Sequence, residues 1–194
     1  MSSEQYDIVI IGAGLSGVGA GVHFSRACPD KSITLFESRD SMGGTWDLFR
    51  YPGIRSDSDM FTLGYGFKPW LNPQGIADGS LIRNYIIEAA EENNISQKIQ
   101  YSQRVTAANW HSDEQCWYLT VTDQKSNSQR TVKANFVMAC TGYYNYQSGY
   151  EPEFTGRETF GGEVIHPQHW PENYDYSGKK VVIIGSGATA VTLA

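Results

Sequence analysis

Two glycine-rich turns in this chain have the residue types and the spacing that bind the diphosphate of a dinucleotide. The first is Gly12-Ala13-Gly14-Leu15-Ser16-Gly17, which directly follows the mainly apolar run 7–11. Gly12 permits a tight turn, Gly14 lets a pyrophosphate approach the backbone, and Gly17 lets the next helix lie close to the strand. The N-terminus of that helix would offer N–H groups and a positive dipole end to the phosphates.

An acidic residue stands where such a site needs one. Glu37 follows the apolar segment 33–36, which we expect to be the second strand, and it lies 20 residues after Gly17. A carboxylate at this spacing accepts hydrogen bonds from an adenosine ribose. A glycine turn alone also occurs as plain structure, but a strand, a helix and an acid in this order favour a dinucleotide site.

The second turn repeats the pattern near the end of the chain. Gly185-Ser186-Gly187-Ala188-Thr189-Ala190 follows the run 179–184, whose apolar residues predict another buried strand. Alanine replaces the third glycine, a change that is common in NADP sites. The chain stops at Ala194, before a further strand or a ribose-binding acid. We therefore expect the chain to be a truncated part of a longer protein.

A long loop over 42–60 is rich in Gly, Pro and Asp, and loops of this length inside a compact domain are usually functional. Gly44 permits backbone contact with a flat ring, and Trp46 can cover such a ring. Asp57 stands close to Arg55 in the sequence, where it could set the local charge of a ring-binding site. A surface ion pair is the alternative interpretation of these two residues.

The elements that must position these residues alternate between strands and helices. Parallel strands are predicted at 7–11, 33–36 and 136–139, which indicates an α/β, Rossmann-like fold. Over 101–133 the apolar period changes to two, which predicts an antiparallel β-meander inserted into the parallel sheet. We expect a first dinucleotide-binding domain over 1–150, a linker over 151–178, and the first βα unit of a second dinucleotide-binding domain over 179–194.

Composition excludes several classes of function. Hydrophobic residues make up 40% and charged residues 19%, which is typical of a globular protein, and the net charge of -6 argues against nucleic acid or an anionic membrane as partner. The apolar stretch 8–24 is too short and too broken by glycine to span a bilayer, and no signal peptide is evident. We expect a cytoplasmic protein, with peripheral membrane contact left open.

No CxxC pair is present, which argues against a redox dithiol and a zinc site; the cysteines are Cys28, Cys116 and Cys140.

A third motif stands between the two glycine turns. The run 160–171 contains Phe160, Gly162, His166, Trp170 and Pro171, spaced as in the signature of Baeyer–Villiger monooxygenases. With this signature, with 43–60 and with 142–146, the chain resembles the class B flavoprotein monooxygenases. The resemblance is greatest to the Baeyer–Villiger branch, especially its mycobacterial ethionamide-activating type, and it covers essentially all 194 residues.

The resemblance implies FAD on the first dinucleotide domain and NADPH on the second. NADPH would reduce FAD, and O₂ would then form a C4a-peroxyflavin that inserts an oxygen atom into a ketone or oxidises the sulfur of a thioether or thioamide. The protein would position the cofactors and keep the flavin site dry. The catalytic arginine of the family would lie beyond Ala194, so this chain could bind flavin without turning over.

Matching the motifs also assigns residues to each cofactor. His166 is expected to act at the linker by coupling domain motion to catalysis, with a purely structural role as the alternative; Arg55 and Asp57 complete the expected catalytic group. The residues expected at FAD are Gly12, Gly14, Ser16, Gly17, Glu37, Gly44, Thr45, Trp46, Asp57 and Val105. Those expected at NADP are Arg55, Ser56, Gly185, Ser186, Gly187, Ala188, Thr189 and Ala190.

Three other functions share part of this pattern. A flavin-containing monooxygenase that oxygenates nitrogen or sulfur is one, but Trp170 favours the Baeyer–Villiger branch, because the N-oxygenating branch generally carries Phe or Tyr there. A catalytically inert flavin-binding fragment is the second. A disulfide reductase has the same two-nucleotide plan, but it requires a cysteine pair that this sequence lacks.

Overall fold

The computed structural model describes residues 4–194 and divides the chain into two compact units. The first unit comprises the chain up to Gly44 together with Arg83–Gly142, and the second comprises Thr45–Ile82 and Tyr143–Ala194. Helix α4 (Gly79–Glu92) crosses from one unit to the other. Within residues 4–194, no helix has the length and apolar character that crossing a bilayer would require.

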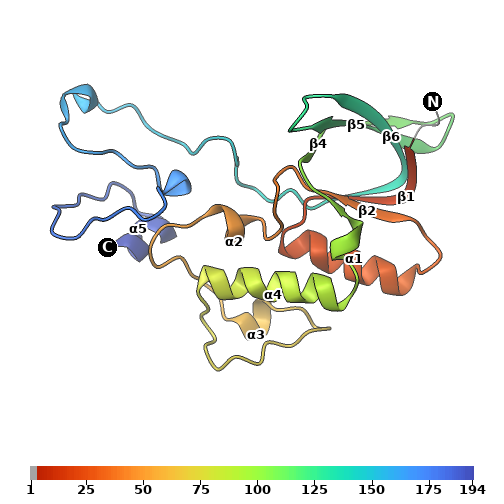
Figure 1. Cartoon of the computed structure of the whole chain (residues 1–194), viewed down its shortest axis with the longest axis horizontal. Helices are drawn as coiled ribbons and strands as arrows, with labels where there is room; N and C mark the ends of the chain where they lie inside the picture. The colour runs from red at the N-terminus through yellow and green to blue at the C-terminus, as the bar shows by residue number, and fades with distance from the viewer. Residues whose placement is uncertain (1–3) are drawn as a thin grey trace. The chain divides into compact units, whose positions relative to one another are not determined.

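The first unit is built on a six-stranded sheet in the order β3-β2-β1-β6-β5-β4 (Figure 1). The pairs β3–β2, β2–β1 and β1–β6 are parallel, whereas β6–β5 and β5–β4 are antiparallel. The mixed α/β fold expected from the sequence is therefore present. The strands are β1 (Glu4–Ile11), β2 (Ile33–Phe36), β3 (Ile99–Gln100), β4 (Gln103–His111), β5 (Cys116–Asp123) and β6 (Gln129–Ala139).

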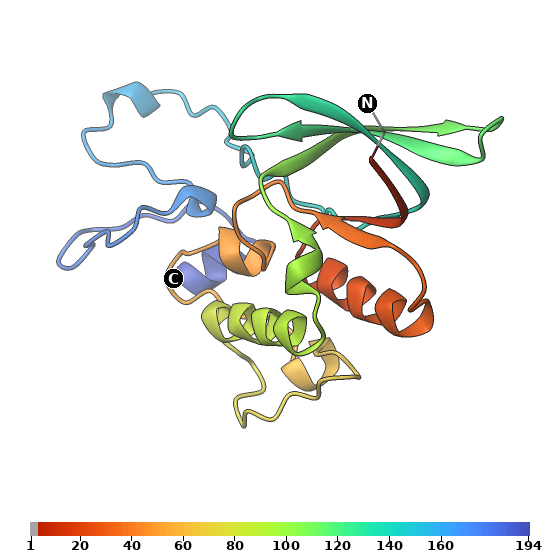
Figure 2. The same ribbon diagram turned by 45° about the vertical axis from the view of Figure 1, so that its right-hand side comes forward.

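The sheet differs from the expectation at β6. The sequence predicted a meander that ends near 133 and a separate strand at 136–139, but β6 is one strand of 11 residues. It pairs with β5 over Gln129–Ala134 and with β1 over Val132–Ala139. No glycine or proline interrupts the segment, and a continuous strand lets the backbone groups near its middle pair on both sides. β6 therefore joins the antiparallel and parallel parts of the sheet, which Figure 2 shows from the side.

Helix α1 (Leu15–Ala27) follows β1 and lies against β1 and β2 (Figure 1). Its glycines at 17, 19 and 21 are buried, although glycine in a helix interior costs about 1 kcal/mol relative to alanine. The close approach of the helix to its neighbours explains their presence: a Cβ on Gly21 would lie 3.2 Å from Ile95 Cγ2 and 3.6 Å from Leu35 Cδ1. The glycines thus let α1 lie close to the elements that carry the first turn.

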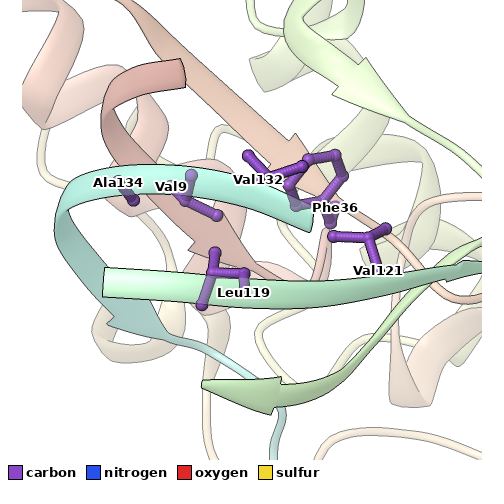
Figure 3. Close-up of a cluster of buried hydrophobic side chains, with 6 residues drawn as sticks. All are labelled: Val9, Phe36, Leu119, Val121, Val132 and Ala134. Carbon is purple, nitrogen blue, oxygen red and sulfur yellow. The ribbon is translucent and has the colours of Figure 1, made fainter. Parts of the chain in front are cut away.

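A hydrophobic core fixes this sheet from one face. Its six side chains are no more than 1% exposed and come from both the parallel and the antiparallel strands. Burial of each valine, leucine or phenylalanine among them contributes about 1.5–3 kcal/mol. The core therefore holds the ends of β1 and β2 in place, where the first glycine turn and Glu37 begin. Figure 3 shows its members, Val9, Phe36, Leu119, Val121, Val132 and Ala134.

The second unit contains short elements and long loops. Its helices are α2 (Thr45–Leu48), α3 (Met60–Leu63), the first turn of α4, α5 (Ala188–Leu193) and two 3₁₀ turns, Arg157–Thr159 and Pro167–His169; a further 3₁₀ turn, Ser96–Lys98, belongs to the first unit. The strand expected over 179–184 is absent from the described residues. Its apolar side chains are exposed, from 37% at Ile183 to 84% at Val182. A strand needs a neighbouring strand to pair its backbone groups, and this segment is not part of the described sheet.

Candidate dinucleotide-binding site

The first glycine turn lies at the carboxyl end of β1, between β2 and β6. The Gly12 N–H donates to the Phe36 carbonyl oxygen at 2.8 Å. Gly12 has φ of +104°, and a Cβ there would lie 2.5 Å from the Cys140 carbonyl oxygen. Both the backbone angle and the space therefore require glycine. In open α/β sheets this edge is where ligands bind.

The start of α1 leaves space over its first turn. Gly14 is the N-cap in an extended conformation, and no side chain caps the helix. A Cβ on Gly14 would lie 3.4 Å from Gly44 Cα, and a Cβ on Gly17 would overlap the Gly12 carbonyl oxygen. Ser16 is exposed on the same turn. The 13-residue helix α1 thus begins at a glycine cap, and Gly44 lies close to that cap. This geometry suits an anionic group.

Glu37 is hydrogen-bonded to the turn itself. Its side chain is only 5% exposed, yet each carboxylate oxygen accepts a backbone N–H. Oε2 accepts from Ala13 N at 2.8 Å, and Oε1 accepts from Arg39 N at 2.9 Å. Because each oxygen can accept more than one hydrogen bond, the carboxylate keeps capacity for hydroxyl donors. The acid is thus held beside the turn in a fixed orientation.

Two other segments of the first unit lie near the acid and the turn. The Gly43 N–H donates to the Ala13 carbonyl oxygen at 3.0 Å, and Gly44 has φ of +58°. The Gln103 N–H donates to the Glu37 carbonyl oxygen at 2.8 Å, which places the start of β4 beside the acid. Burial, and then the negative charge of Glu37, raises the pKa of the nearby Tyr101.

Val105 lies two residues further along β4. It is half-buried and packs against the core. The pairing of β4 with β5 shifts between Val105 and Ala107, which leaves Thr106 as the extra residue of a β-bulge. The Thr106 hydroxyl donates to the Thr120 carbonyl oxygen at 3.3 Å. Bulges of this kind redirect backbone groups and are common beside binding sites.

The loop after the first unit carries five of the expected site residues. Thr45 Oγ1 lies 3.4 Å from the Tyr146 hydroxyl, and Trp46 is half-buried. Ser56 is 2% exposed; its N–H donates to the Ala77 carbonyl oxygen at 3.0 Å and its Oγ accepts from Ala77 N at 3.3 Å. Ser56 therefore fastens the loop. The residues on either side of it, Arg55 and Asp57, are exposed.

A charged contact that the sequence did not reveal joins this loop to the segment after the signature. Arg50 lies 3.5 Å from Asp47 Oδ1 and 3.3 Å from Glu172 Oε1. Asp47 is 1% exposed, so this buried carboxylate has a cation beside it. The i,i+3 spacing of Asp47 and Arg50 is the signal that would have found the pair. A cavity of about 350 Å³ lies here, lined among others by Arg50, Pro52, Trp170 and Tyr174.

The signature forms a compact turn. His166 caps the 3₁₀ turn Pro167–His169, and its Nδ1 accepts the Gln168 N–H at 3.2 Å. The Trp170 ring lies edge-on to Tyr174 and Tyr176, with ring centroids 6.1 Å apart in both pairs. His166 and Trp170 of the signature therefore have structural partners within the second unit.

The second glycine turn begins α5. Gly187 is its N-cap, with φ of −80° and ψ of 175°. Thr189 Oγ1 lies 3.3 Å from the Tyr51 hydroxyl. Thr189 and Ala190 are half-buried, and the other four residues of the turn are exposed: Gly185, Ser186, Gly187 and Ala188.

The expected site residues thus fall into two groups, one in each unit. The first unit brings together the first turn, Glu37 and Gly44, and it places Val105 on β4, whose first residue, Gln103, is hydrogen-bonded to Glu37. The second unit contains the remaining residues, Thr45, Trp46, Arg55, Ser56, Asp57, His166 and Gly185–Ala190.

Comparison with known proteins is consistent with this geometry. The Flavin-binding monooxygenase-like family matches residues 72–194, and the NAD(P)-binding Rossmann-like domain family matches residues 10–72. The chain is 55% identical over 191 residues to the FAD-containing monooxygenase EthA of Mycolicibacterium smegmatis, a match that covers 98% of this chain and 38% of that protein.

Solved structures show the same similarity. A crystal structure of OTEMO in complex with FAD and NADP matches with a TM-score of 0.81 and 29% identity, over 99% of this chain and 37% of that one. Cyclohexanone-bound cyclohexanone monooxygenase matches with a TM-score of 0.83 and 26% identity, over 99% and 36% of the two chains. The chain therefore spans well under half the length of the relatives it matches.

Proposed function

This chain belongs to the flavin-binding monooxygenase-like family, and from this premise we propose that its protein is an NADPH- and O₂-dependent FAD monooxygenase. The reaction we propose is a Baeyer–Villiger oxidation, in which one oxygen atom of O₂ is inserted beside the carbonyl group of a ketone to give an ester. The similarity to a cyclohexanone-bound cyclohexanone monooxygenase supports the substrate class. A bound FAD would supply the electron transfer and the oxygen activation.

The observation that carries the proposal is the contact between the first glycine turn and Glu37. The Glu37 carboxylate accepts the Ala13 N–H at 2.8 Å, and the uncapped N-terminus of α1 follows directly. A dinucleotide needs an acceptor for its ribose hydroxyls beside donors for its diphosphate, and here the two are fixed to each other. A Cβ at Gly12 or Gly17 would overlap backbone atoms of the turn and its neighbour, so only glycines allow the tight turn that fits the adenosine diphosphate part of FAD.

The expected domain organisation supports two cofactors on one chain. We assign FAD to residues 1–150 and NADPH to a domain that begins at 179–194, with 151–178 as the linker. The similarity to OTEMO in complex with FAD and NADP supports this assignment.

The three cysteines are free, and Cys116 is buried, which fits a reducing compartment; we therefore assign the enzyme to the cytoplasm.

Three charged or titratable residues have proposed roles in the second unit. Ser56 fastens the loop to Ala77, so Arg55 and Asp57 are held on both sides of a fixed point while their side chains stay exposed. We assign Arg55 to the negative charge of NADP and Asp57 to the charge balance at the flavin ring. His166, which caps a turn in the linker, is assigned to the coupling between domain motion and catalysis.

Flavin binding tests the first half of the proposal. Protein purified and reconstituted with FAD should be yellow and keep about one FAD per chain after gel filtration. Gly14→Val should lose the flavin, because a valine adds methyl groups to a position whose Cβ already lies 3.4 Å from Gly44 Cα. Gly66→Ala is the matched control, since no atom lies within 4 Å of its Cβ position. Equal flavin content in both variants would contradict the assignment of the first turn.

Turnover tests the second half. Protein produced from its complete gene should oxidise NADPH faster when cyclohexanone is added, and the product should be the lactone with one more oxygen atom. A thioether assayed in parallel distinguishes ketone from sulfur oxygenation by its sulfoxide. Flavin-loaded protein that oxidises NADPH and yields sulfoxide but no ester would assign the enzyme to the sulfur-oxygenating branch instead.

A further inference from the structure

The signature histidine lies against a glycine from a separate segment of the chain. A Cβ built on Gly149 would lie 2.7 Å from His166 Nδ1 and still closer to Cε1 and Nε2. Three atoms of the imidazole are thus in the space that any side chain at position 149 would take. Gly149 has an ordinary backbone angle, so the angle does not require glycine; the ring does.

A second contact fixes the ring from the other side of the turn. His166 Nδ1 accepts the Gln168 N–H at 3.2 Å, so this nitrogen carries no proton. In the neutral ring the proton is then on Nε2, which makes Nε2 a donor. The imidazole therefore has one defined tautomer and one defined direction for its N–H group.

Gln168 links the signature to the segment that carries Gly149. Its side chain is 7% exposed, and its Nε2 donates to the Asn145 carbonyl oxygen at 2.7 Å. Asn145 in turn accepts the Gln147 N–H at 3.0 Å and donates to Ser148 Oγ at 3.2 Å. These bonds make 145–148 a local turn that leads into Gly149. We call Asn145, Gly149, His166 and Gln168 the His166 cluster.

We propose that Gly149 and Gln168 are positioning residues for His166: Gly149 leaves room for the imidazole, the Gln168 backbone N–H fixes its tautomer, and the Gln168 side chain ties the turn to Asn145. This inference rests on the proposed function, which assigns His166 to the catalytic cycle. The ring is the end of a rotatable side chain, so a methyl group at position 149 displaces the ring rather than the backbone. Gly149→Ala should therefore change the direction of the imidazole and leave the fold intact.

The kinetic experiment uses the FAD-loaded protein produced from its complete gene. We expect His166→Ala and Gly149→Ala to lower kcat by similar factors, up to about 100-fold, with unchanged flavin content and an unchanged KM for the ketone. The kcat of the double variant Gly149→Ala/His166→Ala should be no lower than that of His166→Ala alone. Without the imidazole, the methyl group at position 149 has no ring to displace. Gly161→Ala is the matched control: it stands five residues before His166, it is not one of the five signature residues, and no atom is within 4 Å of its Cβ position.

A spectroscopic measurement tests the positioning without turnover. In protein labelled with ¹⁵N-histidine, the signals that disappear in His166→Ala identify this ring, and they should show the proton on Nε2. Gly149→Ala should shift these signals. Gln168→Ala keeps the backbone N–H that Nδ1 accepts and removes only the side-chain bond to the Asn145 carbonyl oxygen, so it should shift the signals and leave the proton on Nε2. Gly161→Ala should leave them unchanged.

The outcomes separate this inference from the proposed function. Unshifted His166 signals in Gly149→Ala, or a kcat equal to that of the wild type, overturn the positioning role even when the wild-type enzyme turns over. A double variant whose losses add also overturns it. If the wild type shows no NADPH-dependent oxygenation, the proposed function fails, while the ¹⁵N signals still report on whether Gly149 positions the ring.

Discussion

The turns at Gly12–Gly17 and Gly185–Ala190 begin their helices in the same way. Gly14 and Gly187 are both extended N-caps, with φ of −81° and −80°, and neither helix has a side-chain cap. Their surroundings differ. A Cβ on Gly14 would lie 3.4 Å from Gly44 Cα, whereas no atom lies within 4 Å of the Cβ position of Gly187. Ala190 stands where the first turn has Gly17, whose Cβ would overlap the Gly12 carbonyl oxygen.

The segments before the two turns also differ, in burial and in strand pairing. Ile8, Val9 and Ile10 of β1 are at most 6% exposed and have paired neighbours on both sides. Val181–Ile184 have a similar apolar sequence, but they form no strand and are at least 37% exposed. The pattern of glycines is therefore enough to form the cap and the helix start, whereas the strand requires its neighbours. Four experiments would break or sharpen this comparison.

The largest difference should appear in amide hydrogen exchange of the 194-residue chain. Amides of β1 open only with much of the sheet, so we expect them to exchange at least about a thousandfold more slowly than free amides. Amides of 181–184 have no strand partner and should exchange close to the free rate. Mass spectrometry of peptides from both segments measures this. Strong protection of 181–184 would show that the two strands are equivalent after all.

Alanine substitutions should also distinguish the packing of the two turns. Gly17→Ala places a methyl group on the Gly12 backbone, which cannot move without disturbing β1, so we expect the free energy of unfolding to fall by about 3 kcal/mol. Gly187→Ala meets no atom and should change it by less than about 0.5 kcal/mol. Urea unfolding followed by fluorescence compares the two. A similar loss in both variants would mean that close packing does not distinguish the turns.

The acid beside the first turn should give the next effect. Glu37→Ala leaves the N–H groups of Ala13 and Arg39 without their acceptor, which costs about 1–3 kcal/mol of stability and lowers the retained FAD. Glu37→Gln keeps one acceptor oxygen and should lie between the wild type and Glu37→Ala. Urea unfolding and flavin content are measured on the same samples. Retention of full flavin content by Glu37→Ala would remove the ribose assignment.

The smallest effect concerns two aspartates beside turns, the half-buried Asp123 at the end of β5 and the exposed Asp175. Hydrogen bonds from the Ser126 backbone N–H and the Gln103 side chain are the main causes that lower the pKa of Asp123 from 3.8 to about 2. Hydrogen bonds from Ser177 lower the pKa of Asp175, which lies before the second glycine turn in the sequence. A lowered folded-state pKa means that the stabilisation is present above the unfolded pKa and disappears as the pH falls through the folded value.

Asp123→Asn should therefore lower the Tm at pH 7, by about 2 °C or less, and the difference from the wild type should vanish as the pH falls from about 4 towards 2. Asp175→Asn should have a smaller effect at pH 7, because its turn joins no strands. Thermal melting across this pH range tests both. A Tm difference for Asp123→Asn that persists at pH 2 would show that its charge is not the cause.

Much of the first unit could be predicted from the sequence because its signals are local. The apolar run of β1, the three glycines of its turn and the spacing of Glu37 each depend on a few neighbouring residues. The continuity of β6 could not be predicted, since it depends on β1 and β5 bordering the strand on opposite sides. The absence of a strand at 181–184 has the same cause, because the apolar pattern does not state whether a partner strand is present.

The site shows the same limit. The spacing of Glu37 indicated an acid near a ribose, but its hydrogen bonds to Ala13 and Arg39 depend on the folded loop. Likewise, Gly149 stands 17 residues before His166 and has no motif of its own. The contact between them became visible only when the two segments were placed side by side.

The β-bulge in β4 has a consequence beyond the neighbourhood of Val105. β4 is the last strand of the sheet, and its nine residues leave one row of backbone groups without a strand partner in this sheet. Long, regular outer strands recruit other chains and promote aggregation. The extra residue Thr106 breaks the regular repeat in the middle of this border. A strand of a second copy of this chain could therefore not pair along the whole length of β4. The bulge thus protects the sheet from growing into a fibre.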